Sequence, residues 1–189
     1  MQIIDKVALQ LSHQIVQASP NKVDAQVVRY FLIRVLTQLM FWVIIILIAI
    51  LLNIGLLTVL AVLITFYPLR RCWGGAHLQN DTACLFVSII TTLLAAWIAA
   101  FMWVNIPAVL VSYLIAFLIV TCTDVVDSPD KPIVKLRSKF RRQGYITLII
   151  LLIINILTLF WGTDIIASAL LLGVASEMIS VVIGKIMYQ

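Results

Sequence analysis

The sequence predicts an all-α, polytopic membrane protein. Of its 189 residues, 63% are hydrophobic and only 11% are charged, and the mean hydropathy is +1.15. Soluble domains average about 45–50% apolar and about 25% charged residues. A chain of this size cannot bury so many apolar side chains, so a water-soluble globule is excluded. Disorder is excluded as well, because it requires low hydrophobicity.

Residues 1–18 predict an amphipathic helix rather than a secretory signal, because they lack an uninterrupted apolar core. Their apolar side chains recur at three- and four-residue spacing, and polar residues fill the other face. The apolar positions are Ile3, Ile4, Val7, Ala8, Leu11, Ile15 and Ala18. Such a helix suits the headgroup plane of a bilayer, and packing on the ends of other helices fits it equally well. Ser19-Pro20-Asn21 then ends it, and residues 22–38 lead into the membrane.

Six apolar runs have lengths near those that a membrane-spanning helix needs. They cover 35–52, 55–69, 84–103, 107–123, 145–161 and 165–187. The first two runs could be one overlong helix, or two short helices that turn at Asn53-Ile54-Gly55.

The basic residues decide between these two readings. All thirteen Lys and Arg residues lie in the N-terminal region, at 70–71, between 131 and 142, or at Lys185. With six spans all four places fall on one side of the membrane, so the positive-inside bias predicts six spans with both termini in the cytoplasm. We therefore expect a single membrane domain over 1–189. It comprises a cytoplasmic or interfacial region at 1–34 and a bundle at 35–189 with cytoplasmic loops at 70–83 and 124–144.

The loop at 124–144 holds three aspartates followed by six basic residues. Ser128-Pro129 and Lys131-Pro132 interrupt any helix there. The basic residues are a topology signal beside anionic lipid, or they form a docking surface for an acidic segment of a partner. The net charge of +5 indicates membrane orientation rather than nucleic-acid binding.

The residues between 70 and 84 carry the candidate chemistry. Arg70-Arg71-Cys72-Trp73-Gly74-Gly75-Ala76-His77 gathers cations, a thiol and an imidazole between two spans. Asn80-Asp81-Thr82 supplies N-cap candidates, which would place Cys84 in the first turn of the next helix. There the amide dipoles favour an anion. A thiol with a pKa near 8.5 is only slightly ionised at neutral pH, so a base such as His77 would make Cys84 a nucleophile.

The spacing of this pair imposes a condition on the backbone. Seven residues of straight helix rise about 10.5 Å, which is beyond hydrogen-bond reach. His77 must therefore lie on a turn that folds back towards Cys84, and Gly74-Gly75 permits such a turn. Asp81 could orient His77, or its charge could oppose formation of the thiolate.

Glu177 lies about halfway along the last span, where an ionised carboxylate is costly. We expect it to bond Ser176, Ser180 or a polar group on another helix, or to be protonated. A structural or gating role is favoured over catalysis, because the candidate pair lies near the cytoplasmic face.

Other classes of protein fit the sequence less well. A small transporter would need more ionisable residues within its spans, or an inverted repeat. A metal site at Cys72, His77 and Cys84 would have three ligands at irregular spacing and no CxxC pair, so neither a metal nor another cofactor is predicted. A non-enzymatic membrane adaptor remains the alternative for a chain without chemistry.

With these residues in place, the chain resembles the AgrB family of bacterial accessory gene regulator proteins, the membrane peptidases of quorum sensing. The resemblance rests on the Arg70-Arg71 pair, on Gly75, His77 and Cys84 with their spacing, and on Lys131-Pro132-Ile133 after the fourth span. The chain length, the amphipathic start and Glu177 in the last span agree with it.

The resemblance implies a cysteine peptidase of the bacterial cell membrane whose catalytic pair is Cys84 and His77. Its partner would be an AgrD-like precursor peptide, from which it removes the acidic C-terminal tail at the cytoplasmic side. A Cys84 thioester would then pass to a nucleophile within the precursor, which gives a cyclic thiolactone or lactone. Membrane lipid surrounds such a protein, and a homodimer is expected. Arg70, Arg71, Gly75, Asp81 and Lys131 would support the site or bind substrate.

Overall fold

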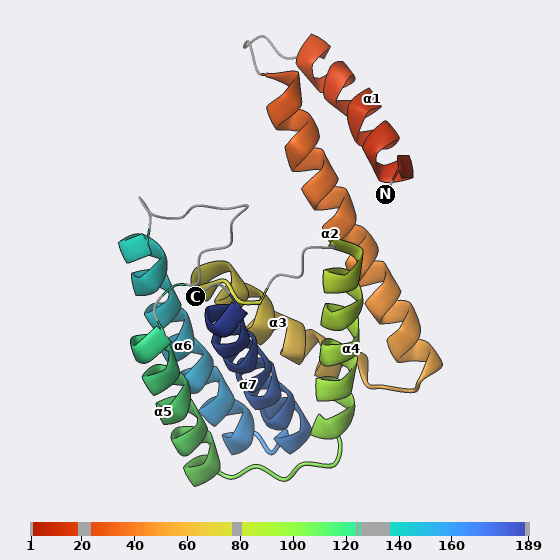
Figure 1. The fold of residues 1–189 in the computed structure, drawn as a ribbon. Helices are drawn as coiled ribbons and strands as arrows, with labels where there is room; N and C mark the ends of the chain where they lie inside the picture. Colours follow the sequence, from red (N-terminus) through yellow and green to blue (C-terminus); the bar gives the residue numbers. More distant parts are fainter. Residues whose placement is uncertain (1, 19–23, 77–80, 124, 126–136, 188–189) are drawn as a thin grey trace. The chain divides into compact units, whose positions relative to one another are not determined.

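The computed structural model describes residues 2–18, 24–76, 81–123, 125 and 137–187. Over these residues the chain forms helices and no strand (Figure 1), which confirms the all-α prediction. The helices are α1 (Gln2–Ala18), α2 (Ala25–Leu51), α3 (Leu56–Trp73), α4 (Asp81–Ala99), α5 (Ile106–Thr123), α6 (Arg137–Phe160) and α7 (Asp164–Met187). They fall into two compact units, Met1–Ile48 and Ala49–Gln189, and each unit is described by itself.

In the part of the chain that the structure describes, five helices are long and apolar enough to cross a membrane, by length and composition: α2, α3, α5, α6 and α7. The apolar part of α4, Ala83–Ala99, is shorter. The chain is thus a multi-pass membrane protein, as predicted from its composition.

The first unit holds α1 and most of α2, joined by an ion pair. Both carboxylate oxygens of Asp5 lie 2.7 Å from Nη2 of Arg29, and both side chains are partly exposed. Helix α2 begins at Ala25, well before the predicted start at 35, because Asp24 caps it: the amide of Gln26 donates to Asp24 Oδ1 at 2.8 Å.

A tight turn separates α2 from α3 where the sequence offered two readings. Asn53 has a φ of 54°, a left-handed conformation that asparagine tolerates, and the amide of Ile54 donates to the Ala49 carbonyl at 2.8 Å. Gly55 then caps α3. The long apolar stretch is therefore two helices, not one.

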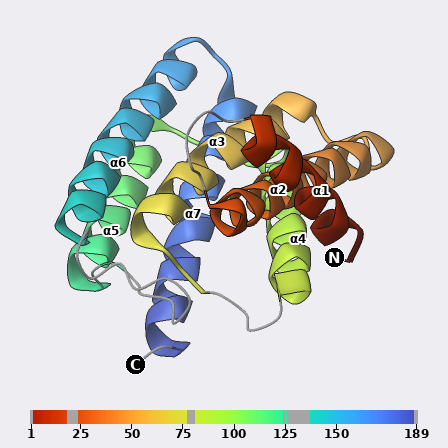
Figure 2. The same ribbon diagram turned by 90° about the horizontal axis from the view of Figure 1, so that it is seen from above.

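Helix α7 is the central element of the second unit. It packs against α3, α4, α5 and α6 (Figure 2), and α3 also contacts α4 and α6. Many of its buried positions are small, among them Ala167, Ala169, Gly173 and Gly184. Without a hydrophobic driving force between helices in lipid, small residues let backbones approach closely. This composition explains why four helices can surround α7.

The ends of α3 and α6 differ from the expected boundaries, and the two helices pack together at Trp73. Helix α3 runs through Pro68 to Trp73, past the predicted end at 69. Trp73 is fully buried, its ring lies 5.2 Å from that of Tyr145, and a methyl group at Gly144 would collide with the indole. Helix α6 starts at Arg137, so the last part of the expected loop at 124–144 is helical.

Candidate active site

A pocket of about 240 Å³ lies between α3, α4 and α7 in the second unit. It sits where α3 ends and α4 begins, beside the C-terminal half of α7. Its lining combines apolar side chains with a guanidinium, a thiol and four hydroxyls: Phe66, Arg70, Ala76, Cys84, Val87, Ser88, Thr91, Ser176, Ile179, Ser180, Ile183 and Met187. Two of the predicted site residues, Arg70 and Cys84, thus meet in one pocket.

Arg70 connects the three sides of this pocket. Its Nη1 donates to Ser180 Oγ on α7 at 2.9 Å, and its Nη2 donates to the Ala76 carbonyl at 2.8 Å. Nη2 also lies 4.0 Å from the sulfur of Cys84. One planar guanidinium therefore contacts α7, the segment after α3, and the candidate nucleophile.

The segment after α3 turns sharply at two glycines and lies on α7. Gly74 and Gly75 have φ angles of 77° and 138°, which glycine adopts at no steric cost. The amide of Ala76 then donates to the Ser180 carbonyl at 2.9 Å. A methyl group at Gly75 would lie 2.5 Å from Ser180 Oγ, and one at Gly184 would lie 2.6 Å from the Gly75 carbonyl carbon. Glycine at both positions is what permits this close approach.

Cys84 lies in the first turn of α4, as the capping pattern predicted, and its side chain is half-buried. Its carbonyl accepts a hydrogen bond from Ser88 Oγ at 2.9 Å. The other two cysteines lie elsewhere: Cys72 is buried in the core and Cys122 is exposed on α5.

The remaining predicted residues are placed as follows. Arg71 is exposed at the end of α3, and Asp81 opens α4, with its side chain outside what the structure describes. His77 and Lys131 lie outside the described residues. The Cys84–His77 pair therefore remains a prediction.

Sequence reasoning placed Glu177 away from the chemistry, whereas the structure brings it to Arg70. Its side chain is fully buried, and Oε2 lies 3.7 Å from Nη1 of Arg70. Ser180 and Gly184 were missed as site residues. A signal existed, because positions 177, 180 and 184 are spaced so as to share one face of a helix.

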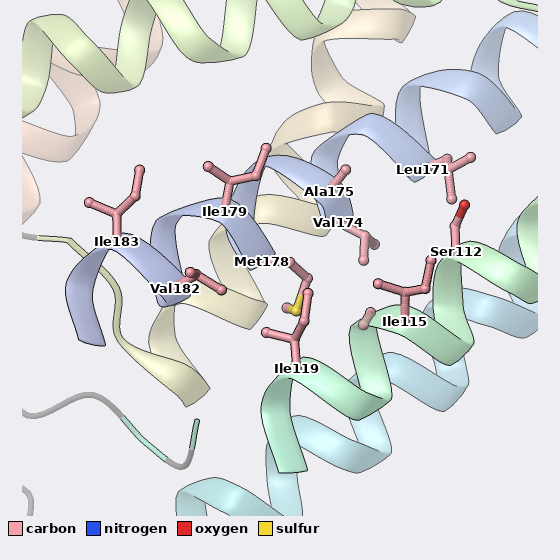
Figure 3. A pocket seen from close by; sticks show the side chains of 11 residues that line it. Ser112, Ile115, Ile119, Leu171, Val174, Ala175, Met178, Ile179, Val182 and Ile183 are labelled. Atoms are coloured by element: carbon pink, nitrogen blue, oxygen red, sulfur yellow. The ribbon is translucent and has the colours of Figure 1, made fainter. Parts of the chain in front are cut away.

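A second, larger groove runs between α5 and α7, with a volume of about 400 Å³. Figure 3 shows Val174 and Met178 of α7 opposite Ile115 and Ile119 of α5. Its lining is aliphatic apart from Ser112 and Met178, and among the described residues it includes no ionisable group. It shares Ile179 and Ile183 with the pocket of Cys84, which is the one that carries reactive side chains.

The chain is a multi-pass membrane protein with a candidate nucleophile. This nucleophile is the thiol of Cys84, which lies beside the partly buried guanidinium of Arg70. The family model for accessory gene regulator B, AgrB, matches residues 4–181 of the chain. The chain therefore belongs to the AgrB family, which comprises membrane cysteine endopeptidases, and membership supports a role in agr quorum-sensing peptide processing. Comparisons with curated proteins and with solved structures gave no match.

Proposed function

We propose that this protein cleaves an AgrD-like precursor peptide, with Cys84 as nucleophile and His77 as general base. The observation that carries the proposal is that Ala76 and Cys84 line the same pocket and both lie against the guanidinium of Arg70. His77 follows Ala76 directly in the chain, and consecutive Cα atoms are about 3.8 Å apart. That supports an imidazole near the sulfur.

In the proposed reaction the Cys84 thiolate attacks the carbonyl carbon before the acidic tail of the precursor. The C–N bond breaks, the tail leaves as an amine, and the proton that His77 took from the thiol is returned to that amine. The product on the enzyme is a thioester. Arg70 is placed to stabilise negative charge on the sulfur or on the carbonyl oxygen.

A thiol or hydroxyl within the precursor would then attack the thioester carbonyl. The new S–C or O–C bond closes a ring, the bond between the acyl carbon and the Cys84 sulfur breaks, and the proton of the attacking group returns Cys84 to its thiol form. No water is consumed, and an internal nucleophile at high effective molarity can outrun hydrolysis. The result is a cyclic thiolactone or lactone peptide.

We place this reaction at the cytoplasmic side of a single membrane domain with six spans and both termini in the cytoplasm. The distribution of Lys and Arg supports this orientation. Lys131 and the basic residues that follow it would attract the acidic tail. Arg71 and Asp81 lie close in the sequence to the pocket residues Arg70 and Cys84. A homodimer is part of the proposal through the family alone.

The test is co-expression with an AgrD-type precursor that carries an N-terminal epitope tag. We expect Cys84→Ala and His77→Ala each to abolish truncation of the precursor on immunoblots, a loss of at least about 10³-fold. Cys72→Ala is the matched control, because Cys72 is a buried core residue outside the pocket, and it should still cut. Mass spectrometry of the product should show a mass one water below that of the linear tail-less peptide.

Truncation that survives Cys84→Ala would refute the peptidase assignment. Loss of truncation in Cys72→Ala at normal protein levels would point instead to a shared role of the cysteines. If the precursor is cut but the product is linear, the proposed cyclisation fails and the proposed cleavage stands.

A further inference from the structure

The guanidinium of Arg70 divides its two terminal nitrogens between two tasks. Nη1 faces α7, where it donates to Ser180 Oγ at 2.9 Å and lies 3.7 Å from Glu177 Oε2. Nη2 faces the reaction pocket, where it donates to the Ala76 carbonyl at 2.8 Å and lies 4.0 Å from Cys84 Sγ. Because the guanidinium is planar and rigid, the contacts of Nη1 determine where Nη2 points.

We propose that Glu177 and Ser180 are positioning residues: they hold Arg70 so that its second nitrogen stays on the Ala76 carbonyl and the Cys84 sulfur. This inference rests on the proposed role of Cys84 as nucleophile. It gives Glu177 a function in the reaction that acts entirely through Arg70, without contact between Glu177 and the substrate.

The burial of Glu177 gives the first physical reason for this role. Its side chain is fully buried within the spans, and neither carboxylate oxygen has a hydrogen-bond partner among the described residues. A charge in such a place is costly unless a partner compensates it, and Arg70 is the cation beside it. This contact and the hydrogen bond from Nη1 to Ser180 Oγ together hold the guanidinium against α7.

The second reason is the way the same guanidinium supports the segment that leads to His77. Ala76 is bound on both sides, since its amide donates to the Ser180 carbonyl at 2.9 Å and its carbonyl accepts from Arg70. Without the contacts of Nη1 with Ser180 and Glu177, Arg70 would release the Ala76 carbonyl, and its positive charge would move away from the sulfur. Both effects lower the reactivity of Cys84.

Other charged side chains near this end of α7 do not replace Arg70. Lys185 donates from Nζ to the Thr123 carbonyl of α5 at 2.8 Å, and Arg71 is exposed at the end of α3. Neither lines the pocket of Cys84. His77 follows Ala76 directly and enters as the base of the proposed reaction.

The test measures the rate at which iodoacetamide alkylates Cys84 at constant pH, in a chain that carries Cys72→Ala and Cys122→Ala. We expect Arg70→Gln to slow alkylation about tenfold, and Glu177→Gln and Ser180→Ala to slow it about threefold or more. In the Arg70→Gln background, Glu177→Gln should cause no further loss, since it acts through Arg70. A structural role alone would slow alkylation equally in both backgrounds.

Matched controls separate this network from general damage. Ser168→Ala removes another buried serine of α7 that also donates to a carbonyl of a neighbouring segment, that of Met102 at 3.1 Å, and it should leave the rate unchanged. Lys185→Gln should do the same, because Lys185 bonds the Thr123 carbonyl of α5 and does not line the pocket. An unchanged or faster rate in Glu177→Gln, or equal losses in both backgrounds, would overturn the proposal.

Precursor cleavage by the same variants distinguishes the two proposals. If Cys84→Ala abolishes cleavage while Glu177→Gln and Ser180→Ala cut and alkylate normally, the positioning role fails and the peptidase stands. If Cys84→Ala still cuts, the peptidase assignment fails whatever the alkylation rates show.

Discussion

Gly184 of α7 is one of the two glycines that allow the segment before His77 to lie against α7. At Gly184 an added methyl group would lie 2.6 Å from the Gly75 carbonyl carbon and 2.7 Å from the Ala76 nitrogen. Both are backbone atoms, which cannot swing aside as the end of a flexible side chain can. Contact between α7 and this segment therefore depends on the absence of a side chain at 184.

We expect Gly184→Ala to reduce precursor cleavage at least about tenfold, because it pushes Ala76 off Ser180 and so weakens the contact with Arg70. The measurement is the cleavage rate of the tagged precursor at matched protein levels. Gly55→Ala is the control: its added methyl meets the Thr58 side chain, with the hydroxyl oxygen at 3.1 Å, far along α3 from the pocket. Normal cleavage by Gly184→Ala would show that this close approach is dispensable.

At the scale of the elements, the crossing of α3 and α7 positions both Arg70 and Ser180. The two helices meet at Gly173, where an added methyl group would collide with the Thr65 hydroxyl and lie 2.9 Å from the Val62 carbonyl oxygen. The Thr65 hydroxyl is itself bonded to the Val62 carbonyl at 2.8 Å. The crossing distance therefore depends on a hydroxyl that is tied to its own helix.

We predict that Gly173→Ala destabilises the fold by about 1–3 kcal/mol, because overpacking at this crossing exceeds the gain of about 1 kcal/mol that alanine brings to a helix. Thermal unfolding in detergent measures the effect. Thr65→Ala removes the nearest colliding atom, so the double variant should recover part of the loss. If the effects of the two substitutions on stability simply add, the collision between residue 173 and Thr65 does not determine the stability of this crossing.

At the scale of the whole chain, the basic residues predict one orientation in the membrane. No Lys or Arg occurs between α4 and α5 or between α6 and α7, whereas they are plentiful in the N-terminal region and between 131 and 142. Asn105 is exposed, and its Oδ1 accepts a hydrogen bond from the Ala108 amide at 3.0 Å at the start of α5. It marks a connection that we expect on the outer side.

In a cysteine-free background, Lys135→Cys should react with an impermeant thiol reagent only in inverted vesicles or opened cells. Asn105→Cys should react in intact cells, which makes it the matched control for access from outside. Labelling of Lys135→Cys from outside would overturn the orientation and with it the cytoplasmic site.

Much of the fold could be predicted because lipid leaves few choices. Backbone groups in a bilayer must be satisfied within the segment, so apolar runs near the spanning length become helices. The turn at Asn53 was predicted from the distribution of the basic residues, and the position of Cys84 in the first turn of α4 from the capping residues before it. The start of α2 at Ala25 was missed, although Asp24 was available as its cap.

The candidate site was predictable only along one stretch of chain. Arg70 and Cys84 were found because they are close in the sequence, and the structure places Nη2 and Sγ 4.0 Å apart. Glu177 and Ser180 come from a helix about a hundred residues later in the chain. The apolar helices have similar compositions, so composition does not predict which face of α7 packs against which neighbouring helix.

By itself, therefore, the sequence determined the membrane class, the helices and the local turn before Cys84, since these depend on hydropathy and on short-range backbone chemistry. Only the tertiary structure decided that the acid of α7 pairs with the guanidinium of α3. The physical reason is that this pairing depends on close packing at small residues such as Gly173 and Gly184, which brings distant segments within hydrogen-bond distance.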